Sequence, residues 1–248
     1  MEFQKYNREA HAEGVPKFFS EKAERPENFK EFIGAVDQAF SDIEEVVGME
    51  ADFDVVVANT DLEEFDEDTP PGLYFRGYSL DKDAHGHADR NKIFLAGPSN
   101  YEFWRPGVKN IAVHEEAHQE FYSNFGDMAH VIWESIVFEG HALMRERTVR
   151  EEKNYDWRGD PREYEGSAQE VIDKLDKNRE WQGQKYHRDN TSSLFSMQSD
   201  WEGIGYVIAL DVYSDMIERN GMDIDESLTK EKTWLRNEVE KSLEKLYD

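Results

Sequence analysis

The sequence predicts an α+β fold, in which one helix and a small mixed β-sheet precede a mainly helical half. Apolar residues between 26 and 48 recur at helical spacing, and three short runs rich in β-branched and aromatic residues follow them. From Val108 onwards the apolar spacing is helical. The chain has 248 residues, 38% of them hydrophobic, and is long enough to bury a core. We therefore expect a single domain, with the helix and sheet in 1–107 and the helical half in 108–248.

The first half is expected to hold one helix and three strands. Seven apolar residues mark one face of the helix: Phe29, Phe32, Ile33, Val36, Phe40, Ile43 and Val47. Gly48 is its expected end, because glycine adopts the left-handed conformation that terminates many helices. The expected strands are FDVVVAN from Phe53, GLYFRGYS from Gly72 and KIFLAG from Lys92.

The second half is expected to consist of helices. Three of them are expected at 108–126, 128–152 and 167–183, and two more near 201–220 and 227–247. The stretch NYDWRGDPREYEG, residues 154–166, is the most loop-like part of this half.

The charge of the chain limits its partners. Its 55 acidic and 29 basic residues give a net charge of -26, and the acids are spread along the whole chain. Such a surface repels nucleic acid and anionic lipid, so neither is an expected partner. The same surface suits concentrated salt, in which counter-ions screen the self-repulsion, so we expect a halophilic source.

The residue inventory limits the chemistry. The chain has no cysteine, which excludes disulfides, thiolate nucleophiles and thiolate metal sites. Any metal must therefore be held by His, Asp or Glu. The first residues have no apolar core or cleavage site of a signal peptide, and no apolar run is long enough to cross a bilayer. We expect a soluble, cytoplasmic protein.

The run HEEAH is the strongest candidate for a functional site. On a helix, His114 and His118 lie four residues apart and project from the same face, so both imidazoles can reach one ion. In such an arrangement Glu115 takes a proton from the metal-bound water. The same pattern also occurs by chance as a solvated stripe. Apolar neighbours favour a buried helix: Ile111, Ala112, Val113 and Phe121.

Glu139 is the candidate third ligand. A catalytic zinc site needs three protein ligands and one open position. Glu139 falls on the same helical face as Ile132 and Leu143, where a carboxylate requires a counter-charge. Gly140, which follows it, would allow another backbone to approach closely. The alternative is a structural Glu paired with an Arg at the edge of the core.

The runs HEEAH and FEGHA resemble the gluzincin branch of the zincin metallopeptidases, to which thermolysin and the aminopeptidase-type enzymes belong. In gluzincins a second helix supplies a glutamate ligand, and the segment between His118 and Glu139 has the length of that branch. The resemblance covers about residues 92 to 220. It implies a zincin-like domain with zinc on His114, His118 and Glu139, and with Glu115 as the general base. The strand KIFLAG precedes the motif helix, and in such proteases an edge strand beside the metal holds an extended substrate.

Two residues depart from the family pattern. Glu116 stands where zincins usually have an apolar residue, and Glu120 stands where they have an apolar or small one. A halophilic surface would account for both residues as solvent-facing acids. The alternative is that they mark a metal site that is no longer catalytic. Three functions are therefore weighed: zinc-dependent hydrolysis of a peptide or protein substrate, a non-proteolytic metal-binding or chaperone-like protein, and a helical protein without metal.

Two further groups are weaker candidates. Tyr206 is the first choice to stabilise the oxyanion that forms during hydrolysis, because it follows Gly203 and Gly205 on the helix expected to support the site. The other residues available for that role are Tyr213, Tyr186 and His187. The loop DAHGHADRN could hold a metal such as Ca²⁺, and its candidate ligands with the Asp before it are Asp81, Asp83, His85, His87 and Asp89. A solvated polar loop is the alternative there. His130 and His141 are expected on a polar helical face with surface roles.

Overall fold

The computed structural model describes residues 2–5, 29–48, 54–59, 76–80, 92–98, 100–102, 104–126, 132–155 and 204–247. The chain divides into two compact units. The first comprises residues 1–120 and 146–159, and the second comprises residues 121–145 and 160–248. Two of the three boundaries fall inside helices, since α4 spans Trp104–Phe125 and α5 spans Ile132–Lys153.

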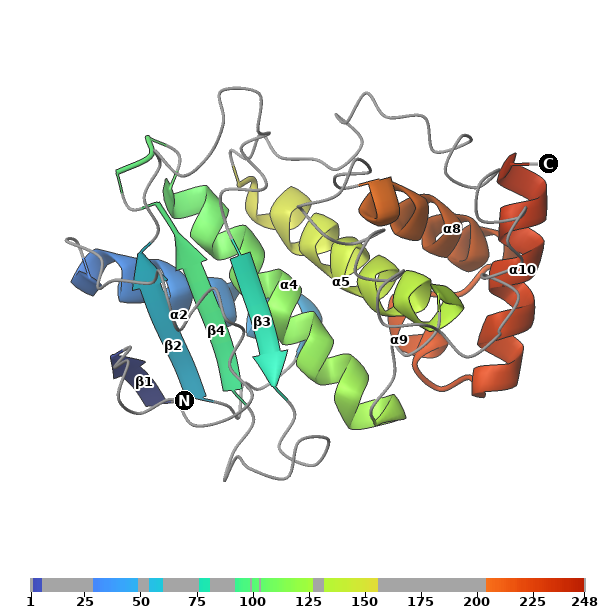
Figure 1. Ribbon diagram of the computed structural model, residues 1–248, viewed down its shortest axis with the longest axis horizontal. Helices are drawn as coiled ribbons and strands as arrows, with labels where there is room; N and C mark the ends of the chain where they lie inside the picture. The colour runs from blue at the N-terminus through green and yellow to red at the C-terminus, as the bar shows by residue number, and fades with distance from the viewer. Residues whose placement is uncertain are drawn as a thin grey trace. The chain divides into compact units, whose positions relative to one another are not determined.

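The first unit contains a four-stranded mixed sheet in the order β1-β2-β4-β3 (Figure 1). The strands are β1 (Glu2–Lys5), β2 (Asp54–Asn59), β3 (Arg76–Leu80) and β4 (Lys92–Gly97). β1, β2 and β4 are parallel to one another, whereas β3 runs antiparallel to β4. The expected mixed sheet is therefore present, but KIFLAG forms the interior strand β4, and β3 is the edge strand next to it.

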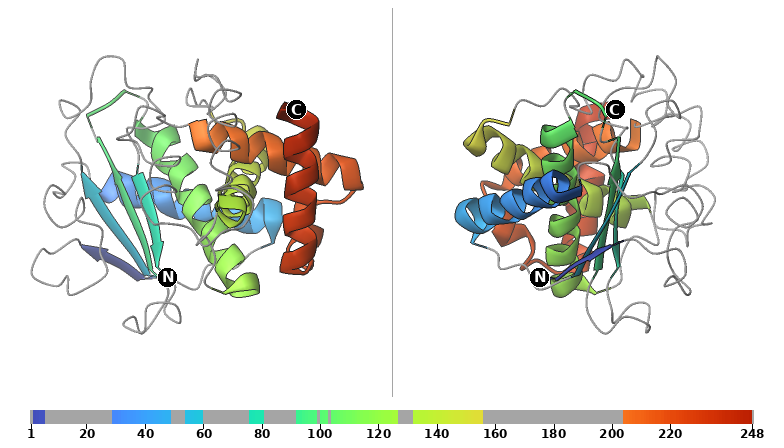
Figure 2. Two further views of the ribbon diagram at one scale, coloured as in Figure 1. Left: turned by 45° about the vertical axis from the view of Figure 1, so that its right-hand side comes forward. Right: turned by 90° about the vertical axis from the view of Figure 1, so that its left-hand side faces the viewer.

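One face of this sheet is covered by α2 (Phe29–Val47) and α4, which lie on the same side of the strands (Figure 2). Alternate residues of the strands point to that side because the side-chain period of a strand is two. Ile93 and Leu95 of β4 are fully buried in a core that also includes Phe32 of α2 and Val113 of α4. The helix α2 ends at Gly48, whose φ of 77° confirms the expected glycine stop.

The second unit is built from helices. It contains parts of α4 and α5 together with α8 (Ile204–Asn220), α9 (Ile224–Ser227) and α10 (Lys232–Tyr247). A Cβ atom at Gly140 of α5 would lie 2.5 Å from Cβ of Tyr213 and 2.6 Å from the carbonyl oxygen of Ala209, both on α8. The expected close approach at Gly140 is therefore made by α8. Any side chain at residue 140 would separate these two helices.

A partly buried charge network joins α8 to α10. Arg219 of α8 donates to the carboxylate of Glu238 and, at 3.0 Å, to the hydroxyl of Ser242. Asn220 also donates to Glu238, at 3.0 Å. Burial alone would raise the pKa of Glu238, but the hydrogen bonds from Lys241, Asn220 and Arg219 outweigh it and hold the pKa at about 2. The carboxylate is therefore kept ionised at the contact between the two helices.

Three sequence expectations need correction or extension. His141 was expected on a polar surface, yet it is fully buried, because apolar side chains surround α5 on most sides. The strand β1 was not expected. The helix α4 begins at Trp104, before the expected start, since Pro106 is compatible with the first turn of a helix. The helix expected at 167–183 lies outside the described residues.

None of the described helices combines the length and the apolar character that crossing a bilayer requires.

Candidate metal centre

The two histidines of HEEAH lie on one face of α4, as their spacing predicts. Their rings are 4.6 Å apart between centroids and are inclined at 87° to one another. Only 7% of His114 and 5% of His118 is exposed. A solvated stripe is therefore excluded for this pair, and two imidazoles point into the protein from adjacent turns.

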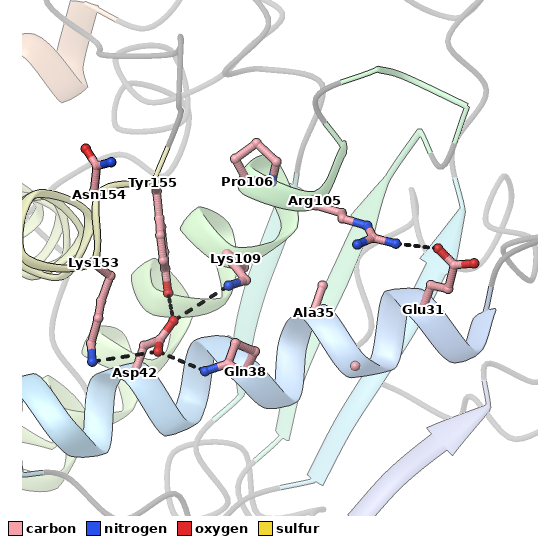
Figure 3. A pocket seen from close by; sticks show the side chains of 11 residues that line it. Glu31, Ala35, Gln38, Asp42, Arg105, Pro106, Lys109, Lys153, Asn154 and Tyr155 are labelled. Atoms are coloured by element: carbon pink, nitrogen blue, oxygen red, sulfur yellow. Dashed lines mark hydrogen bonds and ion pairs between the residues drawn. The ribbon is translucent and has the colours of Figure 1, made fainter.

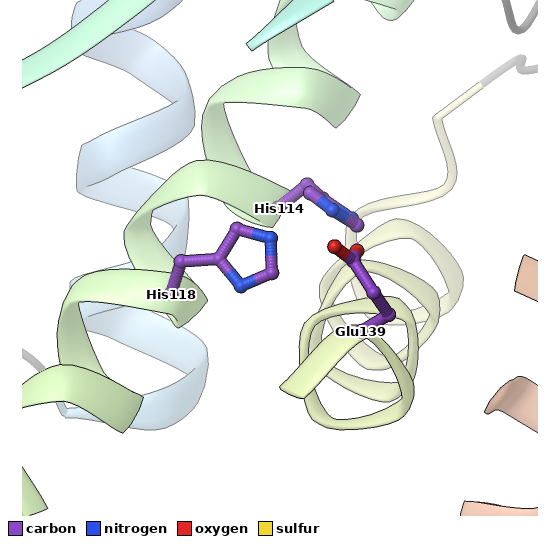
Figure 4. A group of neighbouring side chains, drawn as sticks. All are labelled: His114, His118 and Glu139. Carbon is purple, nitrogen blue, oxygen red and sulfur yellow. The ribbon is translucent and has the colours of Figure 1, made fainter. Parts of the chain in front are cut away.

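Glu139 of α5 completes a group of three possible ligands (Figure 4). Each of His114, His118 and Glu139 offers one ligand atom, and these atoms lie within 4.8 Å of one another. Ligand atoms of a tetrahedral zinc ion with bonds near 2.1 Å lie roughly 3.4 Å apart, so small side-chain rotations would bring the three to bonding distance. Two imidazole nitrogens and one carboxylate oxygen are a donor set that zinc accepts in catalytic sites. The residues present fit a zinc ion.

A second carboxylate, which the sequence did not single out, contacts the first histidine. Oε2 of Glu146 lies 3.3 Å from Nδ1 of His114, and Nδ2 of Asn110 donates to Oε1 of the same carboxylate. A ligating histidine commonly donates its second ring N–H to a carboxylate, which fixes the tautomer and the ring orientation. The sequence holds a signal for each residue. Asn110 lies one turn before His114, and Glu146 lies two turns after Glu139, so each falls near the helical face that carries a proposed ligand.

We expect Glu146→Gln to weaken zinc binding by about 10-fold to 100-fold, since glutamine cannot supply the negative charge that increases the basicity of His114. The dissociation constant is measured by competition with a chromophoric chelator. Glu151→Gln is the matched control, because Glu151 is an exposed residue of the same helix, paired with Arg147. Equal zinc affinity in both variants would contradict a positioning role for Glu146.

The proposed base Glu115 is buried, with 4% of its surface exposed. Its side chain lies against the edge strand β3 at Gly77. Thus the carboxylate that follows the first histidine is held next to β3, an edge strand of the sheet that the described strands form.

Glu116 contradicts the expectation of a solvent-facing acid. Only 1% of the residue is exposed, and neither carboxylate oxygen has a hydrogen-bond partner within the described part of the chain. Burial is the largest cause, and together with the charges of Glu120 and Glu44 it raises the pKa of Glu116 to about 9. At neutral pH the folded protein therefore keeps this carboxyl group protonated. Glu120 itself is partly exposed.

The other residues proposed from the sequence are Tyr206, Tyr213 and seven residues that the structure does not describe. Tyr206 is partly buried and packs against a buried cluster formed by Leu143, Ala209 and Leu210. Tyr213 is buried, and its hydroxyl lies 3.2 Å from Nδ1 of His141 and 2.5 Å from Oγ of Ser227. Seven candidates lie outside the described residues: Tyr186, His187, Asp81, Asp83, His85, His87 and Asp89. The possible calcium site thus stays an expectation.

A groove of about 720 Å³ opens elsewhere in the first unit, between α2, the start of α4 and the end of α5 (Figure 3). One of its lining residues is Asp42, which accepts hydrogen bonds from Tyr155 at 2.5 Å and Gln38 at 2.9 Å. The ammonium groups of Lys109 and Lys153 lie 3.7 and 3.9 Å from the same carboxylate. The carboxylate of Asp42 therefore offsets part of the positive charge of the two lysines, and these contacts tie three helices together.

Comparison of the chain with protein-family models, with curated proteins and with solved structures gave no match.

Proposed function

We propose that the protein hydrolyses peptide bonds with one zinc ion, held by His114, His118 and Glu139 in a zincin-like domain. The observation that carries this proposal is the convergence of three ligand atoms within 4.8 Å, with Glu115 next to the first ligand in the chain. Support also comes from the α+β arrangement, in which the HEEAH helix packs on a small mixed sheet.

The residues around the metal have separate roles in this proposal. A bound zinc ion supplies Lewis-acid chemistry, because it lowers the pKa of a coordinated water and polarises a carbonyl group. Glu115 accepts a proton from the attacking water and delivers it to the leaving amine. Glu146, whose carboxylate lies 3.3 Å from Nδ1 of His114, would fix the orientation of that ring and leave Nε2 available as a ligand.

The edge strand β3 is the proposed support for the substrate. Among the described strands β3 pairs only with β4, so its other side offers main-chain groups to which an extended peptide can bind as a further strand. Glu115 lies against β3 at Gly77. A peptide paired with this edge would therefore pass close to the proposed base.

The test of the proposal is the metal content and peptidase activity of His118→Ala beside the wild type. We expect close to one zinc ion per wild-type chain by elemental analysis in concentrated salt, and cleavage of members of a fluorogenic peptide library. We expect the variant to lose both, because two remaining ligands hold zinc too weakly.

The control is His141→Ala, which removes a buried histidine that is not one of the three proposed ligands. Equal zinc content in the wild type and in His118→Ala would contradict the proposed site, and absence of zinc from the wild type would leave a structural helical protein.

A metal-binding protein without peptidase activity is the second candidate. It is favoured by Glu116, a buried acid at a position where the zincin pattern has an apolar residue. Such a protein would bind zinc through the same three residues but would not depend on Glu115, and substitution of Glu115 separates the two candidates.

A further inference from the structure

Gly77, in the edge strand β3, is the residue at which the sheet meets the side chain of Glu115. A Cβ atom at residue 77 would lie 2.1 Å from Oε1 of Glu115, 2.2 Å from Cγ and 2.3 Å from Cδ. Non-bonded heavy atoms have their optimal separation near 3.5 to 4.0 Å, so these positions cannot be occupied together. Glu115 fills the space that a side chain at residue 77 would need.

The register of the sheet explains this contact. Gly77 pairs with Leu95 in the antiparallel ladder, and residues opposite each other in a ladder share one face of the sheet. Leu95 is fully buried in the core that also contains Ala112 and Val113 of α4. The missing side chain at residue 77 therefore points towards α4, and Glu115 reaches the β3 backbone at that position.

We propose that Gly77 is a positioning residue for Glu115, an inference that rests on the proposed function. The bare backbone at residue 77 gives the carboxylate its place beside the edge of the sheet. Because Cγ collides as well as the carboxylate, an alanine at this position forces the whole Glu115 side chain into another rotamer. Displacement of a catalytic group by about 1 Å lowers a rate on the order of 100-fold.

The kinetic test compares zinc-loaded Gly77→Ala with the wild type on one fluorogenic peptide selected with the wild type. We expect kcat to fall by about 10-fold to 100-fold, with KM within about twofold and zinc content unchanged. The matched control is Gly34→Ala, because Gly34 is an exposed residue of α2 where an added Cβ meets no atom within 4 Å. Wild-type kcat in Gly77→Ala would overturn the inference.

A second measurement does not depend on activity. The urea midpoint is compared for the wild type, Gly77→Ala, Glu115→Ala and the double variant. We expect Gly77→Ala to lower the midpoint in the wild type, and to leave it unchanged when Glu115 is alanine and the colliding atoms are gone.

The two measurements separate failure of the inference from failure of the proposed function. If Gly77→Ala shifted the urea midpoint equally in the wild type and in the Glu115→Ala variant, the inference would be overturned, even in an active enzyme. If Gly77→Ala lowers the midpoint only in the protein that retains Glu115, the contact between residues 77 and 115 is supported. If the wild type then cleaves no peptide, only the proposed hydrolysis is rejected.

Discussion

Glu115→Gln is expected to lower kcat by about 100-fold to 10,000-fold while the protein keeps its zinc. Glutamine has the shape of glutamate and fits the same space against Gly77, but it cannot accept the proton of the attacking water. The zinc content is expected to stay at the wild-type level, because Glu115 is not one of the three proposed ligands. Steady-state kinetics on a fluorogenic peptide and elemental analysis of the same samples measure the two effects.

Glu120→Gln is the control for this experiment, since Glu120 lies on the same helix and is partly exposed. We expect its kcat to stay within about threefold of the wild type, because surface substitutions rarely perturb the fold. If Glu115→Gln retained wild-type turnover, peptide hydrolysis with this base would be rejected. If neither protein turned over any peptide while both held zinc, the metal-binding alternative would be favoured.

Glu116→Gln is expected to stabilise the protein, and to do so more strongly as the pH rises. In the unfolded chain Glu116 ionises near its ordinary pKa of 4.5, whereas in the folded protein the pKa is about 9. Between these two values the folded state binds one more proton than the unfolded state, so the stability of the wild type falls by about 1.4 kcal/mol per pH unit. Glutamine has no such titration. The variant should therefore be more stable by about 3 kcal/mol at pH 7 and nearly equal to the wild type at pH 4.5.

Urea unfolding of both proteins between pH 4.5 and pH 8, in concentrated salt, measures this difference. Asp37→Asn is the control, because it makes the corresponding acid-to-amide substitution at an exposed residue of α2. Its stability difference from the wild type should stay nearly constant with pH. Parallel stability curves for Glu116→Gln and the wild type would contradict a raised pKa for Glu116.

Elements with strong local signals could be predicted from the sequence. The strand β4 has the predicted bounds, because KIFLAG is an apolar run that ends at a glycine. The helix α2 and its stop at Gly48 follow from apolar spacing and from the conformational freedom of glycine. The short strand β1 could not be predicted, since its pairing with β2 depends on residues far away in the sequence.

The candidate site, too, could be predicted from the sequence only in part. The shared face of His114 and His118 follows from helical geometry alone, and the match of Glu139 to the gluzincin pattern pointed to the third residue of the group. Burial of Glu116 could not be predicted, because it depends on which face of α4 packs against other elements. The contact of Gly77 with Glu115 depends on the register between β3 and β4, which short-range patterns do not fix.

The charge network between α8 and α10 also has a consequence for the order of folding. These helices are close in sequence, so bringing them together closes only a short loop, whereas β2 and β4 pair across the whole segment from 60 to 91. Contacts of small sequence separation form faster than parallel strand pairs. In a refolding experiment followed by hydrogen exchange, amides of the α8 and α10 pair should gain protection early, and those of the sheet, on which Glu115 depends for its place, should gain it late.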